Sequence, residues 1–363
     1  MIIEAVEAFP VTIPFGDGAA VPGPGRPAGV TSLLVRVSTD EGHQGWGEAF
    51  GFEAAAVTRR ALEDLVAPLC AGQDATRIGP LMRAAQEKLL VFGRGGPVTH
   101  ALSAVDTALW DIAGKAAGMP LHRLLGGAAA PALPCYASLD PYGGPAAVRA
   151  GVRQALAAGF TDLKLHEREA ASVRAAREEA GPATGLMLDV NCPWTLPQAR
   201  AMAAGLRDLR LKWLEEPLWP PEDYDGLASL RAGCGIPVAA GENVPTLLDF
   251  GRLLSAGAVD FVQPSPAKMG GVTELCKVFH LAAARDVTVM PHTFYHGPGL
   301  LAAVHATAAL GTADSMIEWR YTDLEARLYG DSVLPARGAI QVPAGPGLGA
   351  DPDPQVLRRY RAR

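Results

Sequence analysis

Residues able to do acid–base or metal chemistry recur at intervals of about 25 positions through the second half of the chain. Each ends or follows a short apolar stretch of the kind that forms a buried strand. Carboxylates stand at three successive positions, with a lysine before them and a histidine after them. The set, in chain order, is Lys164, His166, Asp189, Asn191, Glu215, Glu216, Glu242, Ser265, His292 and Glu318.

The first of these positions lies in the segment 162–167, DLKLHE. Successive side chains of a β-strand point to opposite faces. Lys164 and His166 would therefore share one face of a strand, and Leu163 and Leu165 the other. The segment predicts a strand that directs an ammonium group and an imidazole toward one place, which is either solvent or an active site.

Eight apolar stretches in this half have the length of buried strands, and most are separated by Ala- and Leu-rich segments of helix length. They are 135–140, 162–167, 186–191, 211–216, 237–242, 260–265, 287–292 and 315–319. Alternating strands and helices predict a parallel sheet, and eight such strands favour an α/β barrel. An open doubly wound sheet is the rival, but no GxGxxG motif follows an early strand.

In a parallel barrel, the carboxyl ends of all strands open onto one face, where active sites form. The regular spacing therefore predicts that the polar strand ends meet in one pocket. Polar residues also mark strand ends simply because loops begin there. That explanation does not account for acids at three successive ends between a lysine and a histidine, so we expect an active site.

Three of the acids, Asp189, Glu215 and Glu242, would form a hard oxygen site. Converging carboxylates repel one another unless a cation neutralises them. Mg²⁺ suits the set because it takes a few carboxylates, keeps waters and leaves positions open for an anionic substrate. Zn²⁺ fits less well, because no His or Cys ligand spacing accompanies the acids.

The first third of the chain has a different pattern. Residues 1–15 and 30–50 alternate in the manner of strands, whereas residues 54–125 have helical spacing. Between the two strand segments, residues 16–29 are rich in Gly and Pro and are expected to form a mobile loop. Antiparallel strands followed by a run of helices predict an α+β domain.

The composition limits the class of protein. The chain has 363 residues, 49% of them hydrophobic, which is enough for a large core, and its formal net charge of −6 argues against nucleic-acid binding. The five cysteines are far apart and lack CxxC spacing, which fits reduced thiols. We find no signal-peptide pattern and no apolar run long enough to span a membrane, so we expect a cytoplasmic protein.

Eight short motifs extend over nearly the whole chain, and they include most of the polar strand ends. They are GWGE (45–48), DTALWDIAGKAAGMPLHRLLGG (106–127), DVN (189–191), WLEEP (213–217), GEN (241–243), KMGG (268–271), PH (291–292) and IEW (317–319). In this order and spacing they resemble the enolase superfamily, in particular the mandelate racemase-like subgroup of its mandelate racemase/muconate lactonizing enzyme family.

The resemblance implies a fold and a reaction step. The fold is a (β/α)₇β TIM-like barrel, expected over residues 131–325, with an α+β N-terminal capping domain over residues 1–130. The C-terminal segment, 326–363, is expected to return to the capping domain. The shared step of the family is Mg²⁺-assisted removal of the proton α to a carboxylate, which gives an enediolate.

The resemblance also implies roles for the metal-binding positions. Asp189, Glu215 and Glu242 match the ligands of one Mg²⁺ per subunit. Asn191 matches a residue that contacts the substrate or supports the ligands. Glu216 matches no ligand position.

Four further positions match catalytic residues of the family. Lys164 matches the first lysine of a KxK motif, which contacts the substrate carboxylate, and His166 matches the second, which normally serves as a base. His292 matches the histidine base of the opposite face. Glu318 matches the acid that hydrogen-bonds the substrate carboxylate or the enediolate.

The sequence departs from the family pattern at two positions. KxK is replaced by KxH, and Ser265 stands where an Asp normally orients the histidine. Ser265 also stands where muconate-lactonising relatives carry a catalytic lysine, which argues against that subgroup. Lys268, three residues on, is expected to support the site and not to act as a base.

These departures leave the reaction open. A histidine suits proton transfer near neutral pH, so His166 is a credible base, or an acid once protonated; alternatively it only fills space or hydrogen-bonds Glu167 or the substrate. His292, lacking an Asp, is expected to be less basic than usual. It could pair with another acid such as Glu318, or deliver a proton to a leaving hydroxyl.

The substrate contacts are less defined. Arg26 in the Gly/Pro-rich segment could meet a carboxylate or hydroxyl group, and His296 could contact the substrate; both are as well explained as solvated loop residues. The sequence gives no signal for an aromatic cage or an apolar pocket, so the polar strand ends favour a hydroxylated acid. We expect a homo-oligomer, a dimer or an octamer, with a small carboxylate as substrate and neither nucleic acid nor membrane as partner.

We therefore expect a Mg²⁺-dependent lyase that dehydrates an acid sugar or related hydroxy acid. The alternative is an isomerase on the same scaffold, either a racemase or epimerase or a sugar-lactone cycloisomerase. A protein that binds sugar acids without catalysis is a third hypothesis, suggested only by the two departures.

Overall fold

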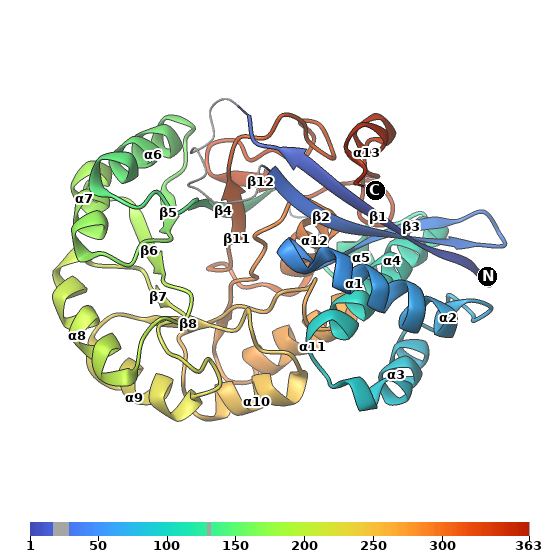
Figure 1. Ribbon diagram of the computed structural model, residues 1–363, viewed down its shortest axis with the longest axis horizontal. Helices are drawn as coiled ribbons and strands as arrows, with labels where there is room; N and C mark the ends of the chain where they lie inside the picture. Colours follow the sequence, from blue (N-terminus) through green and yellow to red (C-terminus); the bar gives the residue numbers. More distant parts are fainter. Residues whose placement is uncertain (17–28, 129–131, 363) are drawn as a thin grey trace.

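The computed structural model describes residues 1–16, 29–128 and 132–362, and it divides into a large barrel and a smaller layered unit beside it (Figure 1). The barrel lies on one side, with its helices outside its strands, and the smaller unit holds the N-terminal strands and helices. Both termini lie on the side of the smaller unit.

All eight strands predicted for the barrel are present, although the structure makes most of them shorter than the sequence pattern does. Their bounds are β4 (Ala132–Leu139), β5 (Asp162–Leu165), β6 (Gly185–Asp189), β7 (Leu214–Glu215), β8 (Val238–Ala240), β9 (Phe261–Val262), β10 (Thr288–Val289) and β11 (Ile317–Tyr321). They pair in parallel in the order β10-β9-β8-β7-β6-β5-β4-β11, and β12 (Ala339–Gln341) pairs antiparallel with β4. The prediction of a TIM-like barrel with an α+β cap is confirmed.

A helix follows each of the first seven barrel strands and covers its outer side (Figure 1). The helices are α6 (Pro145–Ala157), α7 (Ala170–Ala180), α8 (Leu196–Leu206), α9 (Tyr224–Cys234), α10 (Leu247–Ser255), α11 (Gly271–Ala283) and α12 (Pro298–Leu310). The layer between helices and strands is the main apolar core. A second buried cluster, with residues in or next to several of the strands, fills the barrel interior, as in other packed barrels, and includes Tyr136, Met187, Trp213 and Met290.

The ends of the strand order, β10 and β11, are joined by side chains. Among the described residues no backbone ladder connects these two strands. Thr293, just after β10, donates its backbone N–H to Glu318 Oε2 at 2.9 Å and its hydroxyl to the Glu318 carbonyl at 2.5 Å. Glu318 therefore helps to close the barrel at the rim where the polar strand ends gather.

The smaller unit has the predicted order of three strands and then helices. Strands β1 (Ile3–Pro14), β2 (Gly29–Thr39) and β3 (Gln44–Ala49) form an antiparallel sheet in sequence order. The helical region consists of α1 (Ala55–Ala61), a π-helical turn (Leu62–Val66), α2 (Ala67–Cys70), α3 (Ile78–Lys88), α4 (Gly96–Ala117) and α5 (Leu121–Leu124). Alternate residues of the strands and one face of the helices are buried together in the core of the cap.

Helix α4 lies against β3 and also anchors the cap to the barrel. Asp106 accepts hydrogen bonds from the Thr273 backbone N–H at 2.8 Å and its hydroxyl at 2.5 Å, at the start of α11. Ser103 accepts from the Gly270 N–H at 2.7 Å. Glu48, at the end of β3, accepts from the Gly299 N–H at 3.1 Å, in the first turn of α12. These bonds fix the position of the cap above the carboxyl ends of the barrel strands.

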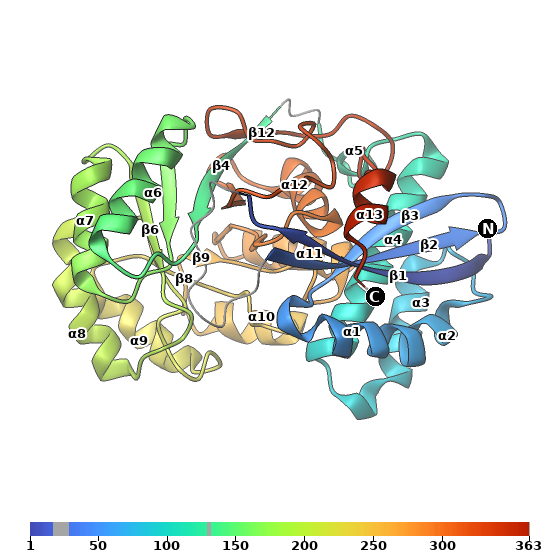
Figure 2. The ribbon, with the colours of Figure 1, turned by 45° about the horizontal axis from the view of Figure 1, so that its top comes forward.

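The C-terminal segment reaches the cap. Helix α13 (Pro354–Tyr360) lies across β1, as both ribbon views show (Figure 2). The Ala362 N–H donates to the Pro10 carbonyl at 2.8 Å, and the Arg361 guanidinium lies 4.5 Å from the centre of the Phe9 ring.

The domain limits drawn at residues 130 and 325 stay predictions. Within residues 1–16, 29–128 and 132–362, no helix has both the length and the hydrophobicity that crossing a membrane requires.

The contact between β3 and α4 gives the first testable prediction. A Cβ atom on Gly47 would lie 1.8 Å from the Ala104 carbonyl oxygen, which is backbone and cannot rotate away. We expect Gly47→Ala to lower the free energy of unfolding by about 1–3 kcal/mol, since one chain or the other must shift. Thermal or urea denaturation measures the change.

Gly205→Ala is the matched control. Gly205 is an exposed glycine of helix α8, where an added Cβ meets nothing within 4 Å. Its substitution should leave the stability unchanged or raise it by about 0.5–1 kcal/mol, because alanine favours the helix. Equal stability of Gly47→Ala and wild type would contradict the packing described for β3.

Candidate active site

The carboxyl ends of the barrel strands line a cavity of about 650 Å³ beneath the cap. Its lining includes the barrel residues His166, Asp189, Glu242 and His292, together with Phe50 and Phe52 of the cap. The four barrel residues belong to the set of polar strand ends, so the structure brings together side chains that are far apart in the sequence.

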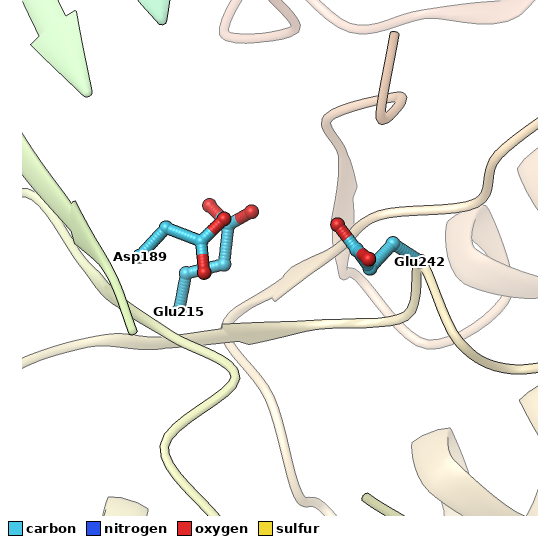
Figure 3. Close-up of side chains that lie close together, drawn as sticks. All are labelled: Asp189, Glu215 and Glu242. Atoms are coloured by element: carbon cyan, nitrogen blue, oxygen red, sulfur yellow. The ribbon is translucent and has the colours of Figure 1, made fainter. Parts of the chain in front are cut away.

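The three acids expected to bind a metal lie at the ends of neighbouring strands. Figure 3 shows Asp189 and Glu215 side by side, with Glu242 facing them from the end of the next strand. One carboxylate oxygen from each can be chosen so that the three lie within 4.8 Å of one another. Parallel pairing of β6, β7 and β8 sets this arrangement, because it aligns the residues at which the strands end.

Lys164 lies among the acids and is fully buried. Its Nζ lies 3.2 Å from Asp189 Oδ2, 2.7 Å from Glu215 Oε1 and 2.8 Å from Glu318 Oε1. Burial alone lowers the pKa of a lysine, but these carboxylates outweigh it and hold the pKa of Lys164 well above its usual value. The ammonium group is therefore permanently charged and forms a fixed positive centre next to the acids.

The pKa values of the three acids are shifted in different directions. Burial and the charge of Asp189 raise the pKa of Glu215 well above its usual value. Burial has the same effect on Asp189 and Glu242, but neighbouring groups outweigh it: Lys164 and His166 lower the pKa of Asp189, and His292 and Lys268 lower that of Glu242. A single lysine thus does not sufficiently stabilise the ionised form of Glu215, which keeps its proton.

This charge imbalance fits a divalent cation. Three hard oxygen donors converge, and one of them retains its proton without further positive charge nearby. Trp213 donates its indole N–H to Glu215 Oε2 at 2.8 Å, and Asp189 Oδ1 accepts the Asn191 N–H at 2.9 Å, so two of the three carboxylates are held in orientation. Asp189, Glu215 and Glu242 could hold Mg²⁺, and the donor set matches the preference of that ion.

His166 lies at the Asp189 side of this cluster, immediately after β5. Its Nδ1 is 2.6 Å from the Leu139 carbonyl oxygen, which can only accept, so Nδ1 carries the proton. Its Nε2 is 3.3 Å from Asp189 Oδ2. In the neutral ring the Nε2 lone pair is therefore the one that faces the cavity, as a general base requires.

His292 lies at the opposite side, beside Glu242. Its Nε2 is 3.0 Å from Glu242 Oε2, and its Nδ1 is 3.2 Å from Ser265 Oγ. Ser265 Oγ also lies 3.0 Å from the Tyr295 hydroxyl, which donates to the His292 carbonyl at 3.0 Å. Ser265 thus occupies the place of the missing carboxylate partner, and it orients the ring through a neutral hydroxyl.

His292 does lie beside another acid, as the sequence left open, but this acid is Glu242 and not the suggested Glu318. Glu318 binds Lys164 and the Thr293 N–H instead, and Glu242 faces His292 Nε2. Because Glu318 holds the barrel closed at β10 and β11, its carboxylate is already committed to these two partners.

Two further predicted residues lie beside the acids. Asn191 lines the cavity with a left-handed φ of 52°. Lys268 Nζ lies 3.4 Å from Glu242 Oε1 and donates to Asn243 Oδ1 at 2.8 Å. Lys268 also lies 4.7 Å from the centre of the Phe50 ring. Both positions are consistent with support for the acids.

Of the remaining two predicted substrate contacts, one lies outside the described residues and the other lines a different cavity. Arg26 lies outside the described residues. His296 lines a neighbouring cavity of about 530 Å³, formed with Trp319 and residues after β11, and within the described chain the lining of the acid cavity does not include it. Burial and the nearby Arg320 lower the pKa of His296 to about 3, so its ring is neutral.

Sequence reasoning missed an aromatic wall. Phe50, Phe52 and Phe294 line the acid cavity, and the Phe294 ring centre lies 5.2 Å from that of His166 and 6.3 Å from that of Phe52. The sequence contained no signal for an aromatic cage or an apolar pocket, so this wall could not be predicted. Phenylalanines from the cap and from the loop after β10 carry no periodic signal, because they meet only when the cap docks.

Sequence reasoning also assigned no role in the site to Glu216. It is buried and has a left-handed φ of 46°. Its carboxylate accepts from Asn243 Nδ2 at 2.6 Å and from Cys192 Sγ at 2.9 Å. Glu216 thereby ties together the loops that follow β6, β7 and β8, each of which carries one of the three acids. Its place next to Glu215, within WLEEP, was the available signal.

The raised pKa of Glu215 predicts that Mg²⁺ binding is linked to pH. Glu215 holds a proton in the metal-free protein at pH values where an ordinary glutamic acid has lost it, and a bound cation requires the carboxylate. We expect Mg²⁺ to bind more tightly as the pH rises and to release a proton. Titration calorimetry in buffers of different ionisation enthalpy measures both effects.

Glu215→Gln is the test variant for this linkage, with the exposed Glu222→Gln as its control. In wild type and Glu222→Gln, a Mg²⁺ concentration 100 times the dissociation constant should stabilise the fold by about 2.7 kcal/mol, and Glu215→Gln should lose most of this gain. Unchanged Mg²⁺ stabilisation of Glu215→Gln would refute the metal site.

Known proteins resemble the chain along most of its length. Residues 29–126 match the family "Mandelate racemase / muconate lactonizing enzyme, N-terminal domain", and residues 147–356 match "Enolase C-terminal domain-like". A D-galactarolactone cycloisomerase of Agrobacterium fabrum is 31% identical over 350 residues, which cover 91% of each chain. A D-galactonate dehydratase of Ralstonia pickettii is 32% identical over 358 residues, which cover 90% of each.

One similar solved structure contains bound magnesium. The crystal structure of a racemase from Streptomyces coelicolor with bound magnesium superimposes with a TM-score of 0.87 at 29% identity, covering 99% of this chain and 100% of that one. The acid cluster here and the bound ion there both fit Mg²⁺. With both family profiles matched and relatives above 30% identity over nine-tenths of its length, the chain belongs to the enolase superfamily, in the mandelate racemase/muconate lactonizing enzyme family.

Proposed function

We propose that this protein is a Mg²⁺-dependent acid-sugar dehydratase, which removes the proton α to a carboxylate and expels the β-hydroxyl as water. The observation that carries the proposal is the pair of histidines facing the acid cluster from opposite sides. His166 Nε2 lies 3.3 Å from Asp189, and His292 Nε2 lies 3.0 Å from Glu242. β-Elimination needs one group that takes a proton and another that gives one, and two such groups flank the site.

One Mg²⁺ per subunit, held by Asp189, Glu215 and Glu242, would supply positive charge to the substrate carboxylate as electron density builds up on it. Lys164 adds a permanently protonated ammonium group close to the same position. Both effects matter because the α-proton of a carboxylate is very weakly acidic.

The two histidines divide the proton transfers. His166, with its proton fixed on Nδ1 by the Leu139 carbonyl, takes the α-proton on Nε2. The bond from the β-carbon to its hydroxyl breaks, and protonated His292 gives the Nε2 proton to the departing oxygen. The enol that results converts to a 2-keto-3-deoxy acid. The Ser265 hydroxyl at Nδ1 orients the ring so that Nε2 is the nitrogen that faces the acids.

Cycloisomerisation is the second candidate, and the name of the Agrobacterium relative favours it. If the leaving oxygen belongs to a lactone ring, the same proton transfers open the ring without loss of water. Racemisation or epimerisation would use both histidines as bases, and it fits the name of the Streptomyces neighbour. A sugar-acid-binding protein without activity remains the least supported alternative.

We further propose that the protein is cytoplasmic and forms a homo-oligomer, either a dimer or an octamer.

Substrate screening separates these hypotheses. Acid sugars and their lactones are incubated with the protein and Mg²⁺ in D₂O and followed by NMR. A 2-keto-3-deoxy product with loss of water supports dehydration, and the same product class from a lactone at constant mass supports cycloisomerisation. Deuterium exchange at the α-carbon without elimination supports racemisation. Binding without exchange would rule out all the enzyme hypotheses.

The division of roles predicts different defects for the two histidine variants. His166→Asn should lower the rate of α-deuterium exchange and of elimination together, by about 10²–10⁴-fold, since it removes the base. His292→Asn should lower elimination by a similar factor but retain measurable exchange. NMR in D₂O resolves both rates, with the exposed His280→Asn as the control. Normal exchange in His166→Asn would show that His166 is not the base.

A further inference from the structure

A second cavity of about 480 Å³ adjoins the acid cavity under the cap. Phe50, Phe52, Pro141 and Phe294 line both cavities, so these residues form the wall between them. The second cavity is therefore the space next to a substrate held at the acids. The groups that line the second cavity therefore bear on which acid sugar fits.

Arg320 is the notable polar group of the second cavity. It follows Glu318 by two residues on β11, so both side chains point to the same side of the strand. Arg320 is 8% exposed, and its buried Nε has no hydrogen-bond partner in the described part of the chain. A buried guanidinium nitrogen without a partner is costly, and a bound ligand would relieve that cost.

Phe294 connects Arg320 to the catalytic side. The Arg320 guanidinium carbon lies 4.3 Å from the centre of the Phe294 ring, and the His166 ring centre lies 5.2 Å from the same point. Arg320 and His166 therefore both lie next to the same phenylalanine. A single sugar chain that passes this ring can have its α-carbon near His166 and its far end near Arg320.

The acids around Arg320 do not neutralise it fully. The nearest, Asp140, lies 3.8 Å away, which is beyond hydrogen-bond distance. Glu318 also acts on Arg320, but its carboxylate is paired with Lys164 and the Thr293 N–H, and Glu53 is exposed to solvent. Glu48 accepts the Gly299 N–H, and burial raises the pKa of its carboxyl group to about 7, so it carries only part of a negative charge at neutral pH. Positive charge at Arg320 thus remains available to an anion.

We propose that Arg320 binds the second carboxylate of a sugar diacid, which makes aldarates or their lactones, and not aldonates, the preferred substrates. This inference rests on the proposed function, since it assumes that the first carboxylate binds at the acid cluster. The planar guanidinium suits a carboxylate because two parallel N–H groups can meet both oxygens. Stacking on Phe294 would hold its plane in a fixed orientation.

Matched pairs of substrates test the proposal. Galactarate and D-galactonate differ only in the oxidation of the terminal carbon, and so do D-glucarate and D-gluconate. For wild type with Mg²⁺, we expect kcat/KM to favour the diacid of at least one pair by 10-fold or more. Arg320→Met should lower the diacid value by about 10- to 100-fold and leave the monoacid value nearly unchanged.

Two further variants separate binding from packing. Arg320→Lys keeps the charge but lacks the fork, so it should recover part of the diacid preference. Arg327→Met makes the same change in the neighbouring cavity that contains His296, and it should keep the full preference. Equal losses for diacid and monoacid in Arg320→Met, or an equal preference in wild type, would overturn the assignment of Arg320.

A binding measurement distinguishes failure of this inference from failure of the proposed function. If no member of either pair undergoes exchange or elimination, the proposed function fails for these acids. The Arg320 site is then judged by the melting temperature with Mg²⁺ and galactarate or D-galactonate. Greater stabilisation by galactarate that Arg320→Met abolishes supports the site. Equal stabilisation by the two acids, or none by either, refutes it.

Discussion

The buried charge of Lys164 is the constraint on which the site depends. A fully buried ammonium group is tolerated only with close, well-oriented partners, and Asp189, Glu215 and Glu318 supply them from three different strands. These three acids outnumber the single lysine, and Glu242 lies close by, so the centre of the barrel carries more negative than positive charge. Burial, together with this imbalance, raises the pKa of Glu215, and a divalent cation at the site would offset both effects.

The fold places the two histidines next to different hydrogen-bond partners. His166 is fixed by a backbone carbonyl that does not change its charge, so its tautomer is set and its second nitrogen faces Asp189 at the acid cluster. His292 is fixed by the Ser265 hydroxyl, within a small network that also includes Tyr295. Identical side chains on opposite sides of one metal site can therefore take opposite roles, one as base and one as acid.

The cap completes a pocket that the barrel only begins. Its position depends on the close approach of β3 to α4 at Gly47 and on the hydrogen bonds of Asp106 to the start of α11. Once docked, the cap adds Phe50 and Phe52 to the aromatic wall, and a second cavity follows behind that wall. The catalytic groups and the groups that choose the substrate thus belong to different layers, although Arg320 comes from the barrel itself.

The sequence alone determined the barrel, the cap and the three acids, because strands of equal direction and spacing must end on one face. Asp189, Glu215 and Glu242 could be predicted to converge for that reason, without any knowledge of the contacts between them. Tertiary structure decided the rest. It paired His292 with Glu242 and not with Glu318, and it put His296 in a neighbouring cavity. It also set Phe294 between His166 and Arg320. These contacts depend on loop paths and on how the cap packs against the barrel, and such long-range packing leaves no periodic trace in the sequence.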